Sequence, residues 1–281
     1  MWSFTHVTVA GCPTPAPVDP NKAGAGSGFP IRCASGMLRE GGCRDAKPNR
    51  WAFAERCGYM VQERIPEREA IVDVEQIEEY IQLSEKLMGY VYRDVVDQAM
   101  KLAPLHGRVL DVGTGFGMLA ITLAQRNPTV EVIGLDVSAT MIEAGKRVIG
   151  RKGLVPRVSF ELADAQAMPF PNNYFDGVIS YGSLHHWLEP EAVFNEINRV
   201  RGPGGMIYIA DLRRDQPRIP LWFLYAIVGL RAGKRMADEM VGSVNAAYTP
   251  SEIGSILGKT NITHWQPMHS FYGINLFSSQ K

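Results

Sequence analysis

The nine residues from Val109 to Gly117, VLDVGTGFG, constrain the fold of this chain more than any other stretch. A short apolar run ends in an acid, glycines follow at every second position, and Met118 to Ala124 has the composition of a helix. Glycine can adopt the positive φ of a tight turn, and it lets a ligand lie against bare backbone. The stretch therefore predicts a strand, a glycine turn and a helix start, the corner at which open α/β sheets bind nucleotides.

The chain after this corner alternates between predicted strands and predicted helices. Apolar runs predict strands at 130–135, 158–161, 175–180 and 204–210, with helices beginning at Ser138 and Pro190. Strands joined by helices imply a parallel sheet with helices on both faces. The chain closes with a predicted helix at 251–258 and a hairpin, in which strands 262–266 and 271–277 flank a turn at Pro267.

Residues 1–60 differ from the rest in composition. Residues 8–30 are rich in glycine, proline, alanine and serine, and their apolar residues follow no helical or strand period. We expect a poorly ordered N-terminal extension there. All four cysteines precede the glycine corner, and none forms a C-x-x-C pair, so ordinary reduced thiols are expected. A site in which the four thiolates converge in space is the alternative. The cysteines are Cys12, Cys33, Cys43 and Cys57.

Residues 61–106 are predicted to form a helical segment. Apolar residues recur at three- or four-residue steps from Val74 to Leu102, after a capping box at Asp73 and Gln76. Gly89 lies within this run and is a predicted joint between two helices. Such a segment before the first strand would pack on the sheet edge or close over a ligand.

Overall charge and hydropathy exclude several classes of protein. The formal net charge is zero, so nothing indicates a general nucleic-acid binder. No stretch reaches the roughly 18 apolar residues of a membrane span, and residues 1–10 lack the pattern of a secretory signal. We therefore expect a cytoplasmic protein.

Three acids fall at predicted strand ends, where open α/β sheets form their ligand crevice. Asp136 has the two acceptor oxygens that a ribose diol needs, and Asp164 with Ala165 could bind an adenine edge. Asp111 could orient the glycine turn or meet a ligand ammonium group. Met118 stands where a dinucleotide fingerprint requires glycine, and no G-K-[ST] is present. The pattern therefore favours a nucleoside that carries an amino acid.

These motifs together resemble the class I S-adenosylmethionine-dependent methyltransferases. The resemblance rests on VLDVGTGFG, Asp136, Asp164–Ala165, FDGVIS and GPGG, and it covers residues 85–277. LHHW at 184–187 is similar to a segment of the quinone-biosynthesis C-methyltransferases, which act on small molecules. The resemblance implies an α/β fold with a Rossmann-like, seven-stranded, mostly parallel sheet in the order 3-2-1-4-5-7-6, strand seven being antiparallel. Residues 107–281 would form this domain.

The same resemblance implies S-adenosyl-L-methionine as cofactor and a small, apolar or aromatic methyl acceptor as substrate. The glycines of the corner would contact the amino-acid end of the cofactor, Asp136 the ribose, and Asp164 and Ala165 the adenine. The full predicted cofactor set is Asp111, Gly113, Thr114, Gly115, Gly117, Asp136, Val137, Met141, Asp164, Ala165 and Ser180. A cofactor-binding regulator that transfers no methyl group is the alternative from another class.

The loop after the fourth predicted strand carries the candidates for catalysis. An acceptor that must lose a proton needs a base there, and His185 or His186 is the candidate; the alternative is a pair of structural loop histidines. No third ligand lies nearby in the sequence, so no metal is expected. Tyr181 is a candidate acceptor contact.

Residues 212–248 form an insertion with an apolar centre, 219–230, flanked by basic residues. We expect a lid over the acceptor, with Trp222 as a contact. A core or homodimer contact and a peripheral membrane contact are the alternatives, because twelve residues are too few to cross a bilayer. Arg213 and Arg214 could pair with an acceptor carboxylate or remain solvated.

Overall fold

The computed structural model describes residues 63–67, 74–216, 218–269 and 273–279. All of them lie in the second of two compact units, Pro48–Lys281. The predictions made for residues 1–60, for the cysteines and for the capping box at Asp73 lie outside the described residues.

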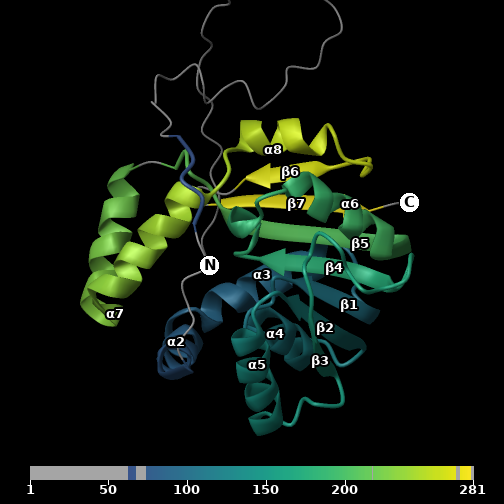
Figure 1. Ribbon diagram of the computed structural model, residues 1–281, viewed down its shortest axis with the longest axis horizontal. Helices are drawn as coiled ribbons and strands as arrows, with labels where there is room; N and C mark the ends of the chain where they lie inside the picture. Colours follow the sequence, from purple (N-terminus) through teal and green to yellow (C-terminus); the bar gives the residue numbers. More distant parts are fainter. Residues whose placement is uncertain (1–62, 68–73, 217, 270–272, 280–281) are drawn as a thin grey trace, which may run out of the picture. The chain divides into compact units, whose positions relative to one another are not determined.

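Seven strands form one sheet in the order β3-β2-β1-β4-β5-β7-β6 (Figure 1). Strands β1 to β5 pair in parallel, and β7 is antiparallel to both β5 and β6. This confirms the predicted Rossmann-like sheet, its strand order and its antiparallel strand. The strands are β1 Gly107–Val112, β2 Val130–Asp136, β3 Val158–Leu162, β4 Phe175–Tyr181, β5 Arg201–Leu212, β6 Gln266–His269 and β7 Gly273–Ser279.

Helices cover both faces of the sheet, as predicted. Because side chains alternate along a strand, Val109 packs with α3, α4 and α5, whereas Leu110 packs on the other face with α6 and α8. The helices are α2 Val74–Leu87, α3 Gly89–Leu102, α4 Met118–Arg126, α5 Ala139–Arg151, α6 Pro190–Val200, α7 Arg218–Ala246 and α8 Pro250–Leu257, with a short 3-10 turn, η1, at Leu184–His186.

Local signals place two helix boundaries correctly. The chain passes from α2 to α3 at Gly89, the predicted joint. The Ser138 hydroxyl accepts a hydrogen bond from the Met141 backbone N–H at 3.3 Å and so caps α5.

The predicted terminal hairpin is wrong in its first strand. Pro267 lies inside β6 and not in a turn, and β6 begins at Gln266. β6 is the last strand of the sheet, where a proline costs no ladder hydrogen bond because the missing N–H can face away from the partner. β5 also begins earlier than predicted, at Arg201.

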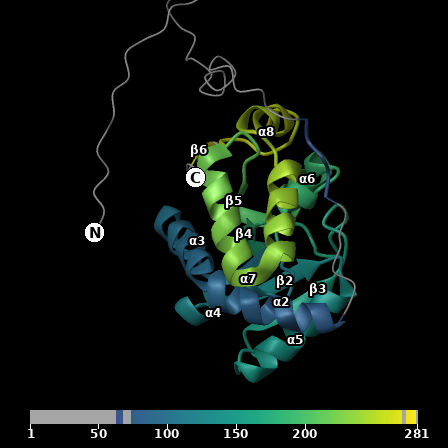
Figure 2. The same ribbon diagram turned by 90° about the vertical axis from the view of Figure 1, so that its left-hand side faces the viewer.

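The insertion forms a helical hairpin. Residue Gly233, with φ 86°, breaks the helical run of α7, and its two arms lie side by side in Figures 1 and 2. Across the arms, the Tyr225 hydroxyl donates a hydrogen bond to Asp238 at 3.0 Å. Among the described helices, none combines the length and the apolar character that crossing a bilayer requires.

Candidate functional site

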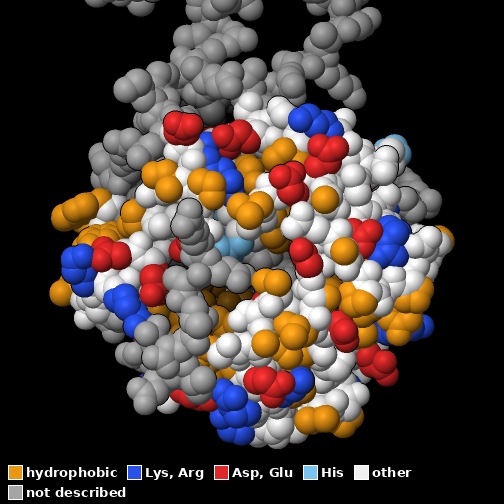
Figure 3. Space-filling model, viewed as in Figure 1, with side chains coloured by type: hydrophobic (Ala, Val, Ile, Leu, Met, Phe, Trp, Pro, Cys, Tyr) orange, Lys and Arg blue, Asp and Glu red, His pale blue; other side chains and the backbone are white. Residues whose placement is uncertain are grey.

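A cavity of about 830 Å³ opens beside the carboxyl ends of β1, β2 and β4. Figure 3 shows the hollow near the centre of this face, edged by apolar side chains. Most of the predicted cofactor residues line it: Asp111, Gly113, Thr114, Gly115, Asp136, Val137, Met141, Asp164 and Ala165. The strand-end residues therefore meet in one place, as the parallel topology predicts.

The three glycines of the corner all have positive φ, but their surroundings differ. A Cβ on Gly113 would meet Ser183 at 2.4 Å, and one on Gly117 would meet the Phe160 ring at 2.6 Å. A Cβ on Gly115, at φ +55°, would meet nothing within 4 Å. Gly113 and Gly117 thus permit close packing, whereas Gly115 leaves bare backbone open at the cavity.

Asp111 holds the corner together from beneath. Its Oδ2 accepts hydrogen bonds from the Thr114 hydroxyl at 2.6 Å and from the Ala120 N–H at 3.2 Å. Burial raises the pKa of Asp111 to about 7. Through these contacts Asp111 links the glycine turn to the first residues of α4.

Asp136 links the end of β2 to the corner and to α5. Its Oδ2 accepts the Gly115 N–H at 2.7 Å, and its Oδ1 accepts the Ser138 N–H at 2.9 Å. Burial raises the pKa of Asp136. The Val137 backbone N–H is a third donor to this carboxylate, whose remaining lone pair is available to a ligand hydroxyl.

Asp164 has a similar local arrangement at the end of β3. Its Oδ1 accepts the Gln166 N–H at 2.8 Å, and its Oδ2 accepts the Gln166 side-chain amide at 3.3 Å. Gln166 lines the cavity beside Ala165.

Two predicted cofactor residues lie outside the cavity lining. Gly117 packs under the Phe160 ring. Ser180 is fully buried, its hydroxyl donates to the Val112 carbonyl at 2.8 Å, and it is paired with the Ser183 hydroxyl at 2.7 Å. Neither residue is therefore in a position to contact a ligand in this cavity through a side chain or open backbone.

The two histidines have different environments. His185 is buried, with its Nδ1 2.8 Å from Asp211 Oδ1 and its backbone N–H donated to Asp211 Oδ2 at 2.8 Å. Burial lowers the pKa of His185, but the Asp211 carboxylate outweighs it, and the net shift is upward. Burial, with the neighbouring His185, lowers the pKa of His186 to about 4. Of the two, only His186 lines the cavity, and it does so as a neutral imidazole near pH 7.

Sequence reasoning missed Glu67, which also lines the cavity. It lies in a short strap, residues 63–67, that is fastened to the end of α7. The Ile65 N–H donates to the Asn245 carbonyl at 3.2 Å, and Ser243 donates to Glu67 Oε2 at 3.0 Å. The Arg64 guanidinium lies 4.2 Å from the centre of the Tyr248 ring. No periodic or motif signal marks such a segment, because its contacts lie more than 100 residues away in the chain.

Tyrosines from three elements also line the cavity. Tyr92 from α3 meets Tyr181 edge-to-face at 5.3 Å between centroids, and Tyr80 from α2 meets Phe116 at 5.7 Å. Tyr181 was expected near the acceptor, and burial raises its pKa. Sequence reasoning did not predict that Tyr80 and Tyr92 line the cavity, because their spacing indicates only that they lie on helices.

The predicted acceptor contact Trp222 and the two arginines considered beside it lie elsewhere. Trp222 is 63% exposed on the first arm of α7 and does not line the cavity. Arg213 pairs with Asp215 at 2.6 Å, and Arg214 pairs with Glu252 at 2.5 Å. Neither arginine is among the cavity residues.

Comparisons with known proteins agree with this architecture. Residues 109–205 match a family model described as a methyltransferase domain. The chain is 37% identical over 119 residues to a demethylmenaquinone methyltransferase of Thermus thermophilus, covering 42% of this chain and 52% of the relative. It is 35% identical over 119 residues to the O-methyltransferase cnsE of Penicillium expansum, covering 42% of this chain and 43% of the relative.

A solved structure of a proposed S-adenosyl-L-methionine-dependent methyltransferase from Methanococcus maripaludis has the same fold. Its TM-score is 0.59 at 21% identity, over 77% of this chain and 97% of the other. The chain spans about half the length of the curated relatives it matches.

Proposed function

We propose that this chain, whose residues 109–205 match a methyltransferase domain, is a class I S-adenosylmethionine-dependent methyltransferase that binds the cofactor and a small acceptor in one cavity and transfers the methyl group between them. One observation carries the proposal: a single cavity brings together the open Gly115 backbone, the strand-end acid Asp136 and an aromatic region at Tyr92 and Tyr181, which is the proposed acceptor end. Cofactor and acceptor can therefore lie end to end.

The residues present fit the cofactor. The Asp136 carboxylate suits a ribose hydroxyl, and the Asp164–Gln166 segment, which also lines the cavity, offers donors and acceptors to an adenine edge. Of the described residues that line the cavity, none is lysine or arginine, and four are carboxylic acids: Glu67, Asp111, Asp136 and Asp164. Such a lining is electrostatically suited to a cationic ligand.

S-adenosylmethionine supplies a methyl group already made electrophilic by its positively charged sulfur. The protein's part is therefore to hold the acceptor in line and to exclude water. Tyr92, Tyr181 and Phe116 provide flat apolar surfaces for an aromatic acceptor. The names of the relatives, a demethylmenaquinone methyltransferase and an O-methyltransferase, fit an acceptor with an aromatic or hydroxylated ring.

His186 is the candidate proton acceptor in this proposal. Its imidazole lines the cavity and is neutral near pH 7, so it can accept a hydrogen bond from an acceptor hydroxyl. His185 is a positioning residue, because its ring and backbone are both held by Asp211.

A second candidate is transfer to a lipid-like or quinone acceptor at a membrane surface. The first arm of α7 exposes Trp222, Phe223, Ile227 and Leu230, with exposed fractions from 49% to 87%. Such an exposed apolar set suits insertion into a bilayer interface, and contact with a second copy of the chain is the alternative occupant.

The decisive experiment measures cofactor binding and turnover separately. We expect calorimetry to give saturable binding of S-adenosylmethionine and a panel of phenols, quinols and aryl amines to yield S-adenosylhomocysteine. Absence of cofactor binding would refute the proposal. Binding without turnover on any acceptor of the panel would favour a cofactor-binding regulator instead.

A further inference from the structure

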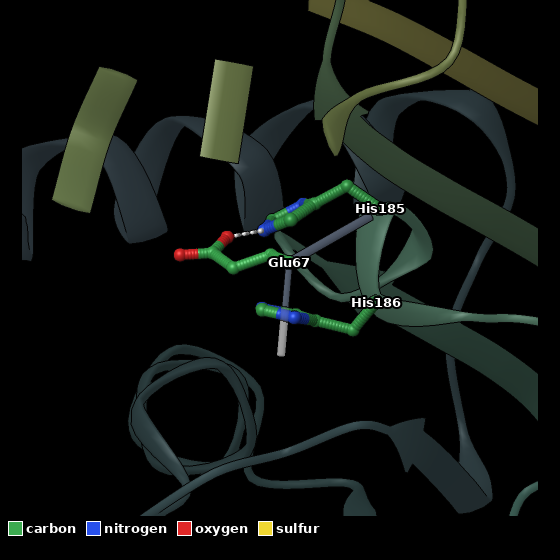
Figure 4. Close-up of side chains that lie close together, drawn as sticks. All are labelled: Glu67, His185 and His186. Carbon is green, nitrogen blue, oxygen red and sulfur yellow. Dashed lines mark ion pairs between the residues drawn. The ribbon is translucent and has the colours of Figure 1, made fainter. Parts of the chain in front are cut away.

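Three potential metal ligands from two distant segments meet at the acceptor end of the cavity. Glu67 belongs to the strap at 63–67, and His185 and His186 belong to η1 (Figure 4). One donor atom from each residue lies within 4.8 Å of the other two. Glu67 and His186 line the cavity, whereas His185 is buried behind them.

Neighbouring side chains hold two of the three donor residues, His185 and Glu67, in position. The Nδ1 of His185 is engaged by Asp211, so its Nε2 is left to face Glu67, whose Oε2 lies 3.7 Å away. That distance exceeds a hydrogen bond. A carboxylate behind a histidine, fixing its ring and leaving the other nitrogen free, is the usual support of a metal-bound imidazole. Glu67 is held in turn by Ser243.

The third donor residue has an unsatisfied atom. The buried Nδ1 of His186 has no hydrogen-bond partner among the described residues. Its ring lies 4.1 Å from that of His185, centre to centre, at 40°. An ion pair between His185 and Glu67 alone would explain why these two side chains are close. It would still leave the Nδ1 atom of His186 without a partner.

We propose that Glu67, His185 and His186 bind a divalent transition-metal ion of the zinc type. Two imidazoles and one carboxylate form a ligand set typical of zinc sites with an open position, whereas magnesium and calcium prefer oxygen ligands. The two carboxylates of Glu67 and Asp211 offset the charge of the ion. Because Glu67 and His186 face the cavity, the open coordination position faces the acceptor end.

The role of such an ion rests on the proposed function. With His186 bound to the ion, the ion and not this imidazole would act on the acceptor hydroxyl, which at the open position would ionise more readily. The site therefore points to an acceptor with an oxygen donor, such as a phenol or quinol. Binding of the ion itself can be tested without any acceptor.

The experiment titrates the full chain with Zn²⁺ against a chromophoric chelator, and with Co²⁺ followed by visible absorption. We expect one ion per chain. Binding should be lost in Glu67→Gln and His186→Ala, and Asp211→Asn should weaken it roughly 10- to 100-fold. Glu189→Gln, at an exposed carboxylate just beyond η1, is the matched control and should bind as the wild type does. Circular dichroism and cofactor calorimetry establish that each variant is folded.

The cysteines require a further control, because thiolates also bind zinc. A chain with Cys12, Cys33, Cys43 and Cys57 changed to serine should keep the ion, and the cobalt spectrum should lack thiolate charge-transfer bands. Loss of binding in this chain, or unchanged binding in Glu67→Gln and His186→Ala, would overturn the proposal. So would absence of stoichiometric binding of Zn²⁺ or Co²⁺. If the ion fails to bind while S-adenosylmethionine still does, the metal inference alone is refuted.

Discussion

Asp136 accepts the backbone N–H of Gly115 at 2.7 Å, and so the end of β2 is tied directly to the glycine corner that follows β1. The Asp136 carboxylate, which is proposed to bind the cofactor's ribose, therefore also fixes the Gly115 backbone. This backbone is proposed to lie against the amino-acid end of the cofactor. The two halves of the cofactor site are coupled through one side chain.

Replacing Asp136 by alanine should weaken S-adenosylmethionine binding by roughly 10- to 100-fold, which is about 1.4 to 2.7 kcal/mol. The variant loses both the ribose acceptor oxygens and the bond that orders Gly115. Calorimetry measures the effect, with Glu161→Gln, an exposed acid on β3, as the control. Unchanged affinity in the variant would contradict the ribose role.

Gly115 and Gly153 allow a matched test of the bare backbone at the cavity. Both have positive φ, +55° and +68°, and a Cβ on either would meet nothing within 4 Å. Changing each to alanine should cost a similar 1 to 2 kcal/mol or so of stability from backbone strain. Only Gly115→Ala should also weaken cofactor affinity, because Gly153 does not line the cavity. Equal affinities of the two variants would count against the proposed placement of the cofactor.

The buried carboxyl of Asp111 should make stability depend on pH. Its pKa is raised to about 7 in the folded protein from 3.8, so the folded state holds a proton that the unfolded chain has released. The contribution of Asp111 to stability should therefore fall as pH rises from about 4 to about 7 and then stay constant, by up to about 1.4 kcal/mol per pH unit.

Urea unfolding of wild type and Asp111→Asn at pH 5 and pH 8 measures this contribution. The asparagine variant does not titrate, so it should gain on the wild type as the pH rises. Taking the difference between the two proteins removes the contributions of the other acids. A difference that is the same at both pH values would show that Asp111 has an ordinary pKa.

The exposed first arm of α7 is tested by changing both Trp222 and Phe223 to glutamate. If this arm contacts a membrane, sedimentation with anionic lipid vesicles should be lost, because charged side chains do not enter the apolar interface. Tyr90→Glu, an exposed aromatic on α3 at 82% exposure, is the control. Light scattering tests the alternative, in which a second copy of the chain covers the arm. A dimer that the double variant converts to monomers would assign the arm to self-association.

The parts of this structure that follow from local pattern could be predicted from the sequence. The strand–glycine–helix corner and the meeting of Asp111, Asp136 and Asp164 at one edge follow from apolar runs and parallel connections, whereas the strand order followed from the resemblance to the class I methyltransferases. The hairpin at the end could not be placed, because Pro267 marks a turn locally and only its position on a free sheet edge makes it compatible with β6.

The acceptor end depends on contacts that no local pattern encodes. Glu67 reaches η1 across more than 100 residues of sequence, and Tyr80 and Tyr92 look like ordinary positions on helical faces. Trp222 was predicted to contact the acceptor but is exposed, because an apolar segment does not reveal which of its residues face the protein.

The strap at 63–67, Tyr80 and Tyr92 all precede β1, whereas Asp111, Asp136 and Asp164 all follow its start at Gly107. Part of the proposed acceptor side, Glu67, Tyr80 and Tyr92, is thus encoded ahead of the three acids, whereas Tyr181 and His186 follow them. Chimaeras joined just before Gly107 would exchange that part between relatives without altering any of the three acids. The same division would let acceptor preference diverge by recombination while the more demanding nucleoside pocket is inherited whole.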